Sequence, residues 1–359
     1  MHIPDGYLSP TTCATLYAGA ITGWYAALKR VKRVVLTRVV PLISVFAAFS
    51  FVVMMFNLPL PGGTTGHALG VTIAAIVLGP SGAILAISIA LAIQALFFGD
   101  GGISTLGANS FNMAIVGSLV AYASYRLIAA GSNITSKRRV VSAAIAGYLA
   151  INATAFLAAL EFGIQPVLFH NAQGTPLYAP YPLSVALPAM MIGHLTFAGL
   201  AEAAISAGLV AYLQVADPAL LQGIGTEVGT PGAVVTTRGV RGSLRQLWIA
   251  VALLMLLTPL GILAAGKAWG EWSPSTWANA ASPPQAATAT SPSSAAAIPA
   301  GWQRLSNLWT APFPAYAPGF VRSAGFGYLL SAMFGVGFLL AISLVVQGYV
   351  ERRQATRYP

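Results

Sequence analysis

The chain has 359 residues, of which 57% are hydrophobic and only 7% are charged, and its mean hydropathy is +0.75. This small number of charged side chains cannot cover the surface of a water-soluble domain. The composition therefore excludes a water-soluble protein and predicts an integral membrane protein. The net charge of +10 would also fit a nucleic-acid partner, and the positions of the charges must decide between the two.

Nine apolar segments predict about nine membrane-spanning helices. Their approximate ranges are 10–28, 39–57, 68–79, 81–98, 110–128, 140–162, 182–214, 246–266 and 325–349. The third segment is short for a full crossing and ends at Gly79-Pro80, so we expect residues 68–98 to form a broken or tilted pair. The predicted fold class is an all-α, multi-span membrane bundle.

The basic residues gather at the ends of these segments, in the clusters 29–38, 137–139, 238–245 and 352–357. The positive-inside rule places such clusters in the cytoplasm, which puts the N-terminus outside and the C-terminus inside the cell membrane. On this assignment 15 of the 18 Lys and Arg residues are cytoplasmic, and the exceptions are Lys267, Arg304 and Arg322. The basic balance therefore indicates topology, with lipid and not nucleic acid as the partner.

The N-terminal stretch MHIPDGYL differs from a secretory signal, because its only charge is Asp5 and the positive charges follow the first apolar segment. We therefore expect Met1 and His2 to remain on the mature protein, on the outer side. The α-amine of Met1 and the amide nitrogen of His2 can close a five-membered chelate ring on a metal ion. A side-chain nitrogen of His2 adds a six-membered ring and leaves one position in the plane.

Nitrogen sites of this tetragonal kind suit Ni²⁺ and Cu²⁺ and tolerate Co²⁺. The candidate for the fourth donor is His67, in the Pro- and Gly-rich stretch LPLPGGTTGHALG (58–70), where the backbone bends easily. The predicted topology places His2 and His67 on the same side of the membrane.

Three motifs carry a resemblance to a known family: MHIPDGYL at the start, GGTTGHALG around His67, and IQALFFGDGGISTLGANSFNMAIVG at 93–117. Over residues 1 to about 215 the chain resembles the cobalt- and nickel-specific substrate-binding components of energy-coupling-factor transporters, the CbiM/NikM family. The resemblance implies a helical membrane protein whose metal ligands are Met1, His2 and His67. It also implies two kinds of partner, a coupling transmembrane protein and cytoplasmic ATPase subunits.

Polar residues of the third motif are candidates for support of the site. Asp100 lies in a glycine-rich outer loop, and Asn109 and Asn112 enter the next helix on roughly one face. Polar side chains at membrane depth need hydrogen-bond partners inside the bundle. We expect these three to hold the N-terminal segment and orient the imidazoles, with capping and joining of helices as the alternative.

The remainder of the chain reads as a second unit. Residues 216–245 are predicted to be a cytoplasmic linker, and 246–359 a two-helix membrane unit whose outer loop is disordered at 273–300, a run of Ala, Ser, Pro and Thr. Through TPLGILAAGKAWGEW (258–272) this unit resembles the small accessory component of cobalt and nickel transporters, here fused to the first unit.

The chain lacks the H-E-x-x-H, G-x-S-x-G and G-x-x-x-x-G-K-[ST] signatures, so it is predicted not to be an enzyme and to have no ATPase site of its own. It is expected to need no intrinsic cofactor and to carry Ni²⁺ or Co²⁺ as cargo. The alternative is a proton-coupled secondary transporter that would use His194 and Glu202. A haem or redox protein would instead make His170 and His194 equally important.

Overall fold

The computed structural model describes residues 1–31, 36–60, 64–222, 237–263, 299–306 and 308–355. Most of the loop predicted to be disordered, and part of the predicted linker, lie outside these residues. The helical elements are α1 (Pro10–Val31), α2 (Leu36–Met54), α3 (Val71–Ile93), η1 (Gln94–Phe98), α4 (Leu106–Asn109), η2 (Ser110–Val116), α5 (Gly117–Ile128), α6 (Lys137–Leu168), α7 (Leu183–Gly193), η3 (His194–Ala198), α8 (Gly199–Ala216), η4 (Pro218–Gln222), α9 (Thr237–Leu257), η6 (Thr258–Leu263), α11 (Ala300–Leu305), η8 (Pro314–Tyr316) and α12 (Ala324–Ala355).

The prediction of a helical membrane protein is confirmed. In the part of the chain that the structure describes, six helical stretches are long and apolar enough to cross a membrane, and the apolar part of α2 is shorter. The six are Val71–Phe98, Leu106–Ile128, Lys137–Leu168, Leu183–Ala216, Arg245–Ile262 and Ala324–Val350. The first expected segment forms α1, which carries four threonines and two tyrosines and is correspondingly less apolar.

The two expected segments at 68–79 and 81–98 form one continuous element, α3 followed by η1. The expected interruption is present inside it, because Gly79 has φ 72° and ψ 168°, far from helical values. Glycine adopts such angles without the steric cost of a Cβ, and Pro80 then begins the second helical piece. A Cβ added at Gly82 would lie 2.7 Å from that of Leu78, so the chain turns sharply here.

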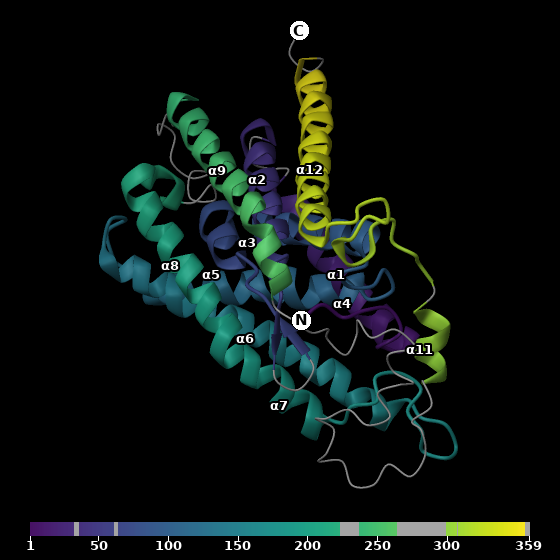
Figure 1. Ribbon diagram of the computed structural model, residues 1–359. Helices are drawn as coiled ribbons and strands as arrows, with labels where there is room; N and C mark the ends of the chain where they lie inside the picture. The colour runs from purple at the N-terminus through teal and green to yellow at the C-terminus, as the bar shows by residue number, and fades with distance from the viewer. Residues whose placement is uncertain (32–35, 61–63, 223–236, 264–298, 307, 356–359) are drawn as a thin grey trace.

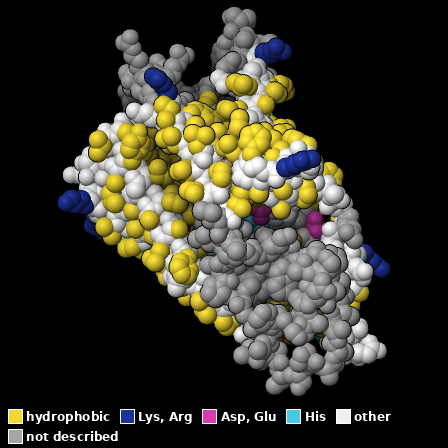
Figure 2. All heavy atoms as spheres, viewed as in Figure 1, with side chains coloured by type: hydrophobic (Ala, Val, Ile, Leu, Met, Phe, Trp, Pro, Cys, Tyr) yellow, Lys and Arg dark blue, Asp and Glu magenta, His cyan; other side chains and the backbone are white. Residues whose placement is uncertain are grey.

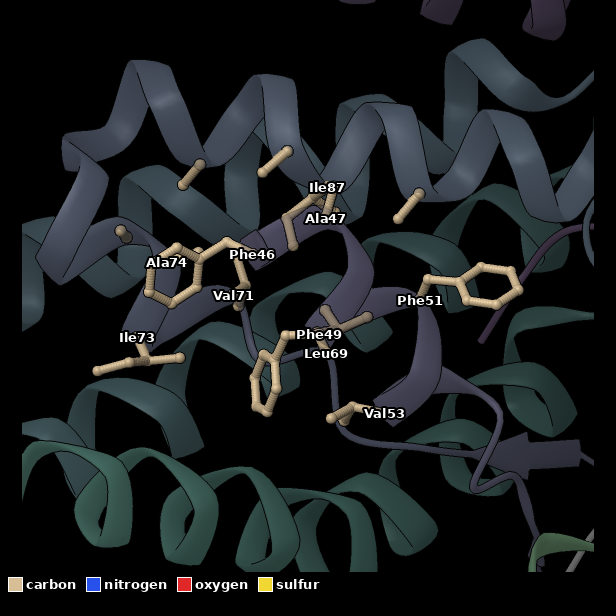
Figure 3. Packing of buried hydrophobic residues seen from close by; sticks show 14 of the residues in the cluster. Phe46, Ala47, Phe49, Phe51, Val53, Leu69, Val71, Ile73, Ala74 and Ile87 are labelled. Carbon is tan, nitrogen blue, oxygen red and sulfur yellow. The ribbon is translucent and has the colours of Figure 1, made fainter. Parts of the chain in front are cut away.

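The centre of the bundle is the contact between α2 and α3, which is shown in Figure 3. Phe46 and Phe49 project from α2 into the buried cluster that includes Leu69 and Ile87. Phe51 points away from them, toward the rings of Phe98 and Tyr316. These side chains are buried, and their packing holds the segment before α3 against α2.

The later helices cover this centre from two sides. Helix α6 packs along α7 and α8, whereas α9 and α12 pack against α2 (Figure 1). On the face shown in Figure 2, apolar side chains spread over much of the described surface and the few visible basic side chains lie scattered among them. Leucines and phenylalanines stand exposed on the outer faces of α6, α8, α9 and α12, as expected for contact with lipid tails.

Candidate metal centre

The N-terminal segment is folded into the bundle, with Met1 and Ile3 buried. The backbone N–H of Ile3 donates to Oδ1 of Asn109 at 2.8 Å, and Nδ2 of Asn109 donates to the Ile3 carbonyl at 3.0 Å. The N–H of Gly102 donates to the same carbonyl at 3.0 Å. Both the N–H and the carbonyl group of Ile3, the residue after His2, are therefore hydrogen-bonded.

The turn that follows is fixed by Asp5 and two glycines. The Asp5 carboxylate accepts the backbone N–H groups of Ile103 at 3.1 Å and Ser104 at 2.7 Å. Gly6 has φ +87°, in the left-handed region that favours glycine. A Cβ at Gly102 would lie 2.3 Å from the Asp5 backbone nitrogen, so the two segments can approach this closely only with glycine at that position.

This anchoring brings His2 against His67. Their rings are stacked, with centroids 4.7 Å apart and planes inclined by 22°. Nδ1 of His2 lies 2.9 Å from Oδ1 of Asp100, and Nδ1 of His67 lies 3.1 Å from the Ala68 carbonyl oxygen. Nε2 of each ring is buried without a hydrogen-bond partner.

The protonation state of His67 suits a ligand role. Burial, followed by the nearby charges of His2 and the N-terminus, lowers the pKa of His67 well below its ordinary value, so this imidazole is neutral at physiological pH. A neutral ring whose Nδ1–H donates to a carbonyl keeps an unprotonated Nε2. For Asp100, burial raises the pKa, but His2, the hydrogen bonds from His2 and Tyr316, and His67 outweigh it, so the pKa falls and the carboxylate stays charged.

The loop that carries His67 is held from both ends. A short antiparallel pair of strands, β1 (Leu58–Leu60) and β2 (Thr64–Gly66), ends directly before it. After it, Gly70 has φ +66°, and a Cβ there would lie 2.5 Å from the Phe49 ring. The carboxyl group of Glu202 accepts the N–H of Leu69 at 2.8 Å and of Gly70 at 2.9 Å, and so caps α3 from α8.

Of the three residues expected to support the site, two contact the N-terminal segment, whereas the side chain of the third, Asn112, bonds a residue of α6. Asp100 contacts His2 and Asn109 holds Ile3, both within the N-terminal anchor. Asn112 has a different partner, because its Nδ2 donates to Oε2 of Glu161 at 2.9 Å.

The other candidate metal ligands form no hydrogen bond or ring contact with His2 or His67. His170 is exposed and bonds the Asn171 carbonyl, and Cys13 is buried near the start of α1. His194 is buried, with Nδ1 at 2.8 Å from the Met190 carbonyl. Among the described residues, no group of three His, Cys, Asp or Glu side chains is arranged to hold a metal ion. The two imidazoles supply only two ligands, so a metal ion bound here would also need main-chain nitrogen donors.

Sequence reasoning missed Gln94, Thr105 and Tyr316. Thr105 donates its hydroxyl to the Ile3 carbonyl, and Tyr316 donates to Oδ2 of Asp100 at 2.6 Å. Nε2 of Gln94 donates to the Tyr316 hydroxyl at 2.9 Å. Gln94 and Thr105 lie inside the third motif and were accessible to inspection, whereas Tyr316 is 216 residues from Asp100 and no local pattern indicates it.

The family model described as the cobalt uptake substrate-specific transmembrane region, CbiM, matches residues 2–220. The chain belongs to the CbiM family. As a member of this family it is a multi-pass membrane protein, and the relatives compared are named as nickel, cobalt or metal transport proteins.

Two fused nickel transport proteins are similar to this chain over most of its length. It is 51% identical to the fused nickel transport protein NikMN of Rhodobacter capsulatus over 95% of both chains. It is 43% identical to the probable fused nickel transport protein LarMN of Lactiplantibacillus plantarum, over 76% of this chain and 78% of the other. A crystal structure of a transition metal transporter is similar at 52% identity and a TM-score of 0.57, over 60% of this chain and 92% of the other.

Proposed function

We propose that this chain is the substrate-binding component of an ATP-driven energy-coupling-factor system that imports Ni²⁺ or Co²⁺. The stacked pair of His2 and His67, with both Nε2 atoms buried and unpaired, is the observation that carries the proposal. A buried polar atom without a partner is costly, and a metal ion bound to Nε2 of His67 would remove that cost at this ring. The names of the fused nickel transport relatives support the choice of ion.

In this proposal the ligands are the α-amine of Met1, the amide and imidazole nitrogens of His2, and Nε2 of His67. The six-membered chelate ring can close only through Nδ1 of His2, which now contacts Asp100. In this proposal the imidazole turns about its Cβ–Cγ bond when the ion binds, so that Nδ1 faces the ion and Nε2–H takes its place at the Asp100 carboxylate. Binding also displaces protons from the amine, whose ordinary pKa is about 7.7 to 8.0, so the affinity rises with pH through that range.

The proposed organisation follows the full-length alignment with the fused relative. Residues 1–215 form the metal-binding unit, 216–245 the linker and 246–359 the accessory unit. A coupling membrane protein and separate ATPase subunits supply the work, since the chain has no G-x-x-x-x-G-K-[ST] motif.

The decisive experiment adds one alanine ahead of Met1. This change keeps every side chain but moves the amine and alters the chelate rings, so we expect saturable Ni²⁺ and Co²⁺ binding by the purified protein to be lost. The variants His2→Ala and His67→Ala should lose it as well, while His170→Ala, at an exposed histidine outside the pair, should bind normally. Unchanged binding by the extended chain would remove the N-terminus from the ligand set.

The energy source needs a separate measurement. Vesicles that contain this chain alone should not accumulate the ion, whatever the proton gradient, and accumulation should appear when the coupling protein, the ATPase subunits and ATP are supplied. Gradient-driven uptake by the chain alone would favour the secondary transporter.

A further inference from the structure

The chain after residue 299 reaches the N-terminal site. The indole N–H of Trp309 donates to the Leu96 carbonyl at 2.8 Å, and the N–H of Phe313 donates to the Phe97 carbonyl at 2.9 Å. Both acceptors lie in η1, directly before the loop that carries Asp100. This segment therefore docks on the element that positions Asp100.

Tyr316 completes a hydrogen-bonded chain to His2. Its hydroxyl donates to Oδ2 of Asp100 at 2.6 Å, and Oδ1 of the same carboxylate lies 2.9 Å from Nδ1 of His2. Gln94 donates to the Tyr316 hydroxyl at 2.9 Å and so leaves the hydroxyl proton directed at Asp100. Two hydrogen bonds thus connect a residue near the C-terminal helix to the first imidazole of the metal site.

The backbone at this point is unusual, because Ala315 and Tyr316 have φ of 53° and 57°. Successive non-glycine residues in the left-handed region are strained, and such strain persists only where surrounding contacts impose it. Here Ser331 donates its hydroxyl to the Tyr316 carbonyl at 3.0 Å, and the Tyr316 ring stacks on Phe98 at 4.7 Å. The packing holds the phenol in a single position against Asp100.

We propose that Tyr316 is a positioning residue of the metal site: it holds the Asp100 carboxylate, which accepts the Nε2–H of the His2 imidazole once Nδ1 has turned to the ion. The inference rests on the proposed function, because it assumes that His2 is a ligand. It assigns to the C-terminal unit a direct part in the affinity for the ion. Outer partners of this kind typically change metal affinity by about 10- to 100-fold.

The test compares two tyrosines of the same unit in the full chain, purified in detergent and titrated with Ni²⁺ against a chromophoric chelator. Tyr316→Phe keeps the ring and its stacking but removes the donor to Asp100. Tyr328→Phe is the matched control, since its hydroxyl donates at 2.7 Å to the Met55 carbonyl and its ring lies 5.2 Å from that of Tyr316. We expect Kd to rise by about tenfold or more for Tyr316→Phe, and by less than about twofold for Tyr328→Phe, whose hydroxyl does not touch Asp100.

A double-mutant cycle separates positioning from general support. In an Asp100→Asn background, Tyr316→Phe should raise the Kd for Ni²⁺ by less than about twofold, because the carboxylate through which Tyr316 acts has been removed. A Tyr316→Phe affinity within about twofold of the wild type, or an equal loss in both backgrounds, would overturn the role of Tyr316. Wild-type protein that binds Ni²⁺ no better than His2→Ala would instead overturn the proposed function itself.

Discussion

At the scale of single residues, the chemistry depends on which ring nitrogen each histidine leaves free. The Ala68 carbonyl and the Asp100 carboxylate engage the two Nδ1 atoms, so both Nε2 atoms are the unpaired ones. Nε2 of His67 can bind the ion without a change of ring orientation, whereas at His2 the contact with Asp100 must pass from Nδ1 to Nε2 before a chelate ring can close. Capture of the ion therefore involves a rearrangement at His2 and none at His67.

The depressed pKa of His67 has a consequence for stability. Between its folded-state pKa and the ordinary value of about 6.5, the unfolded chain binds a proton that the folded chain does not. Stability should therefore fall as the pH drops below about 6.5, by up to about 1.4 kcal/mol per pH unit from this residue. We expect the Tm of metal-free wild-type protein to decline more steeply between pH 6.5 and 5 than that of His67→Gln. Parallel declines would show that burial does not depress this pKa.

The residues of the candidate site differ in how far sequence could predict them. His2 and His67 stand out because donor atoms are rare in so apolar a chain, and Asn109 because an amide at membrane depth needs a partner. The same reasoning grouped Asn112 with the N-terminal anchor, yet it bonds Glu161, because helical periodicity gives a shared face and not the neighbour opposite it. The role of Tyr316 could not be predicted, because only the tertiary packing brings it to Asp100.

At the scale of elements, α8 positions the His67 loop through Glu202. This carboxyl group accepts two backbone N–H groups that would otherwise be unpaired at the start of α3. Both oxygens of Glu202 face backbone N–H groups, since the backbone nitrogen of Thr72 lies 3.5 Å from Oε1, so the NH2 group of a glutamine would face a donor. A buried donor without an acceptor costs about 1–3 kcal/mol, and we expect Glu202→Gln to reduce stability by about 2 kcal/mol. Because the capped residues follow His67 directly, Ni²⁺ affinity should fall as well.

A matched control for this prediction is Glu161→Gln. Glu161 is also buried, but it accepts one side-chain amide, from Asn112, and caps no helix. Thermal unfolding and Ni²⁺ titration of both variants would test the cap. Equal losses of stability and affinity in the two variants would mean that the cap contributes nothing specific to the His67 loop.

The helices themselves were largely predictable, because long apolar runs leave few alternatives in a membrane protein. The break at Gly79-Pro80 was visible as a pair of residues that rarely continue a helix. The short hairpin before His67 could not be predicted, since residues 58–66 carry no alternating apolar pattern. The contact of the C-terminal unit with η1 was also hidden, as hydropathy says nothing about which helices meet.

At the scale of the whole molecule, orientation remains a prediction from the basic clusters, and α6 offers a direct test. This helix has 32 residues, so it is about 48 Å long at 1.5 Å per residue and exceeds the hydrocarbon core of about 30 Å. The loops at its two ends must therefore face opposite sides of the membrane. Thr135 precedes α6 beside the cluster 137–139, Gln173 follows it, and both are exposed.

We expect Gln173→Cys to react with a membrane-impermeant maleimide in intact cells, and Thr135→Cys to react only after the cells are permeabilised. Both variants carry Cys13→Ala, which removes the one native thiol. The reverse pattern would invert the topology and place the His2 and His67 site toward the cytoplasm, which would be incompatible with capture of an external ion. Labelling of both positions in intact cells would instead contradict the crossing of the membrane by α6.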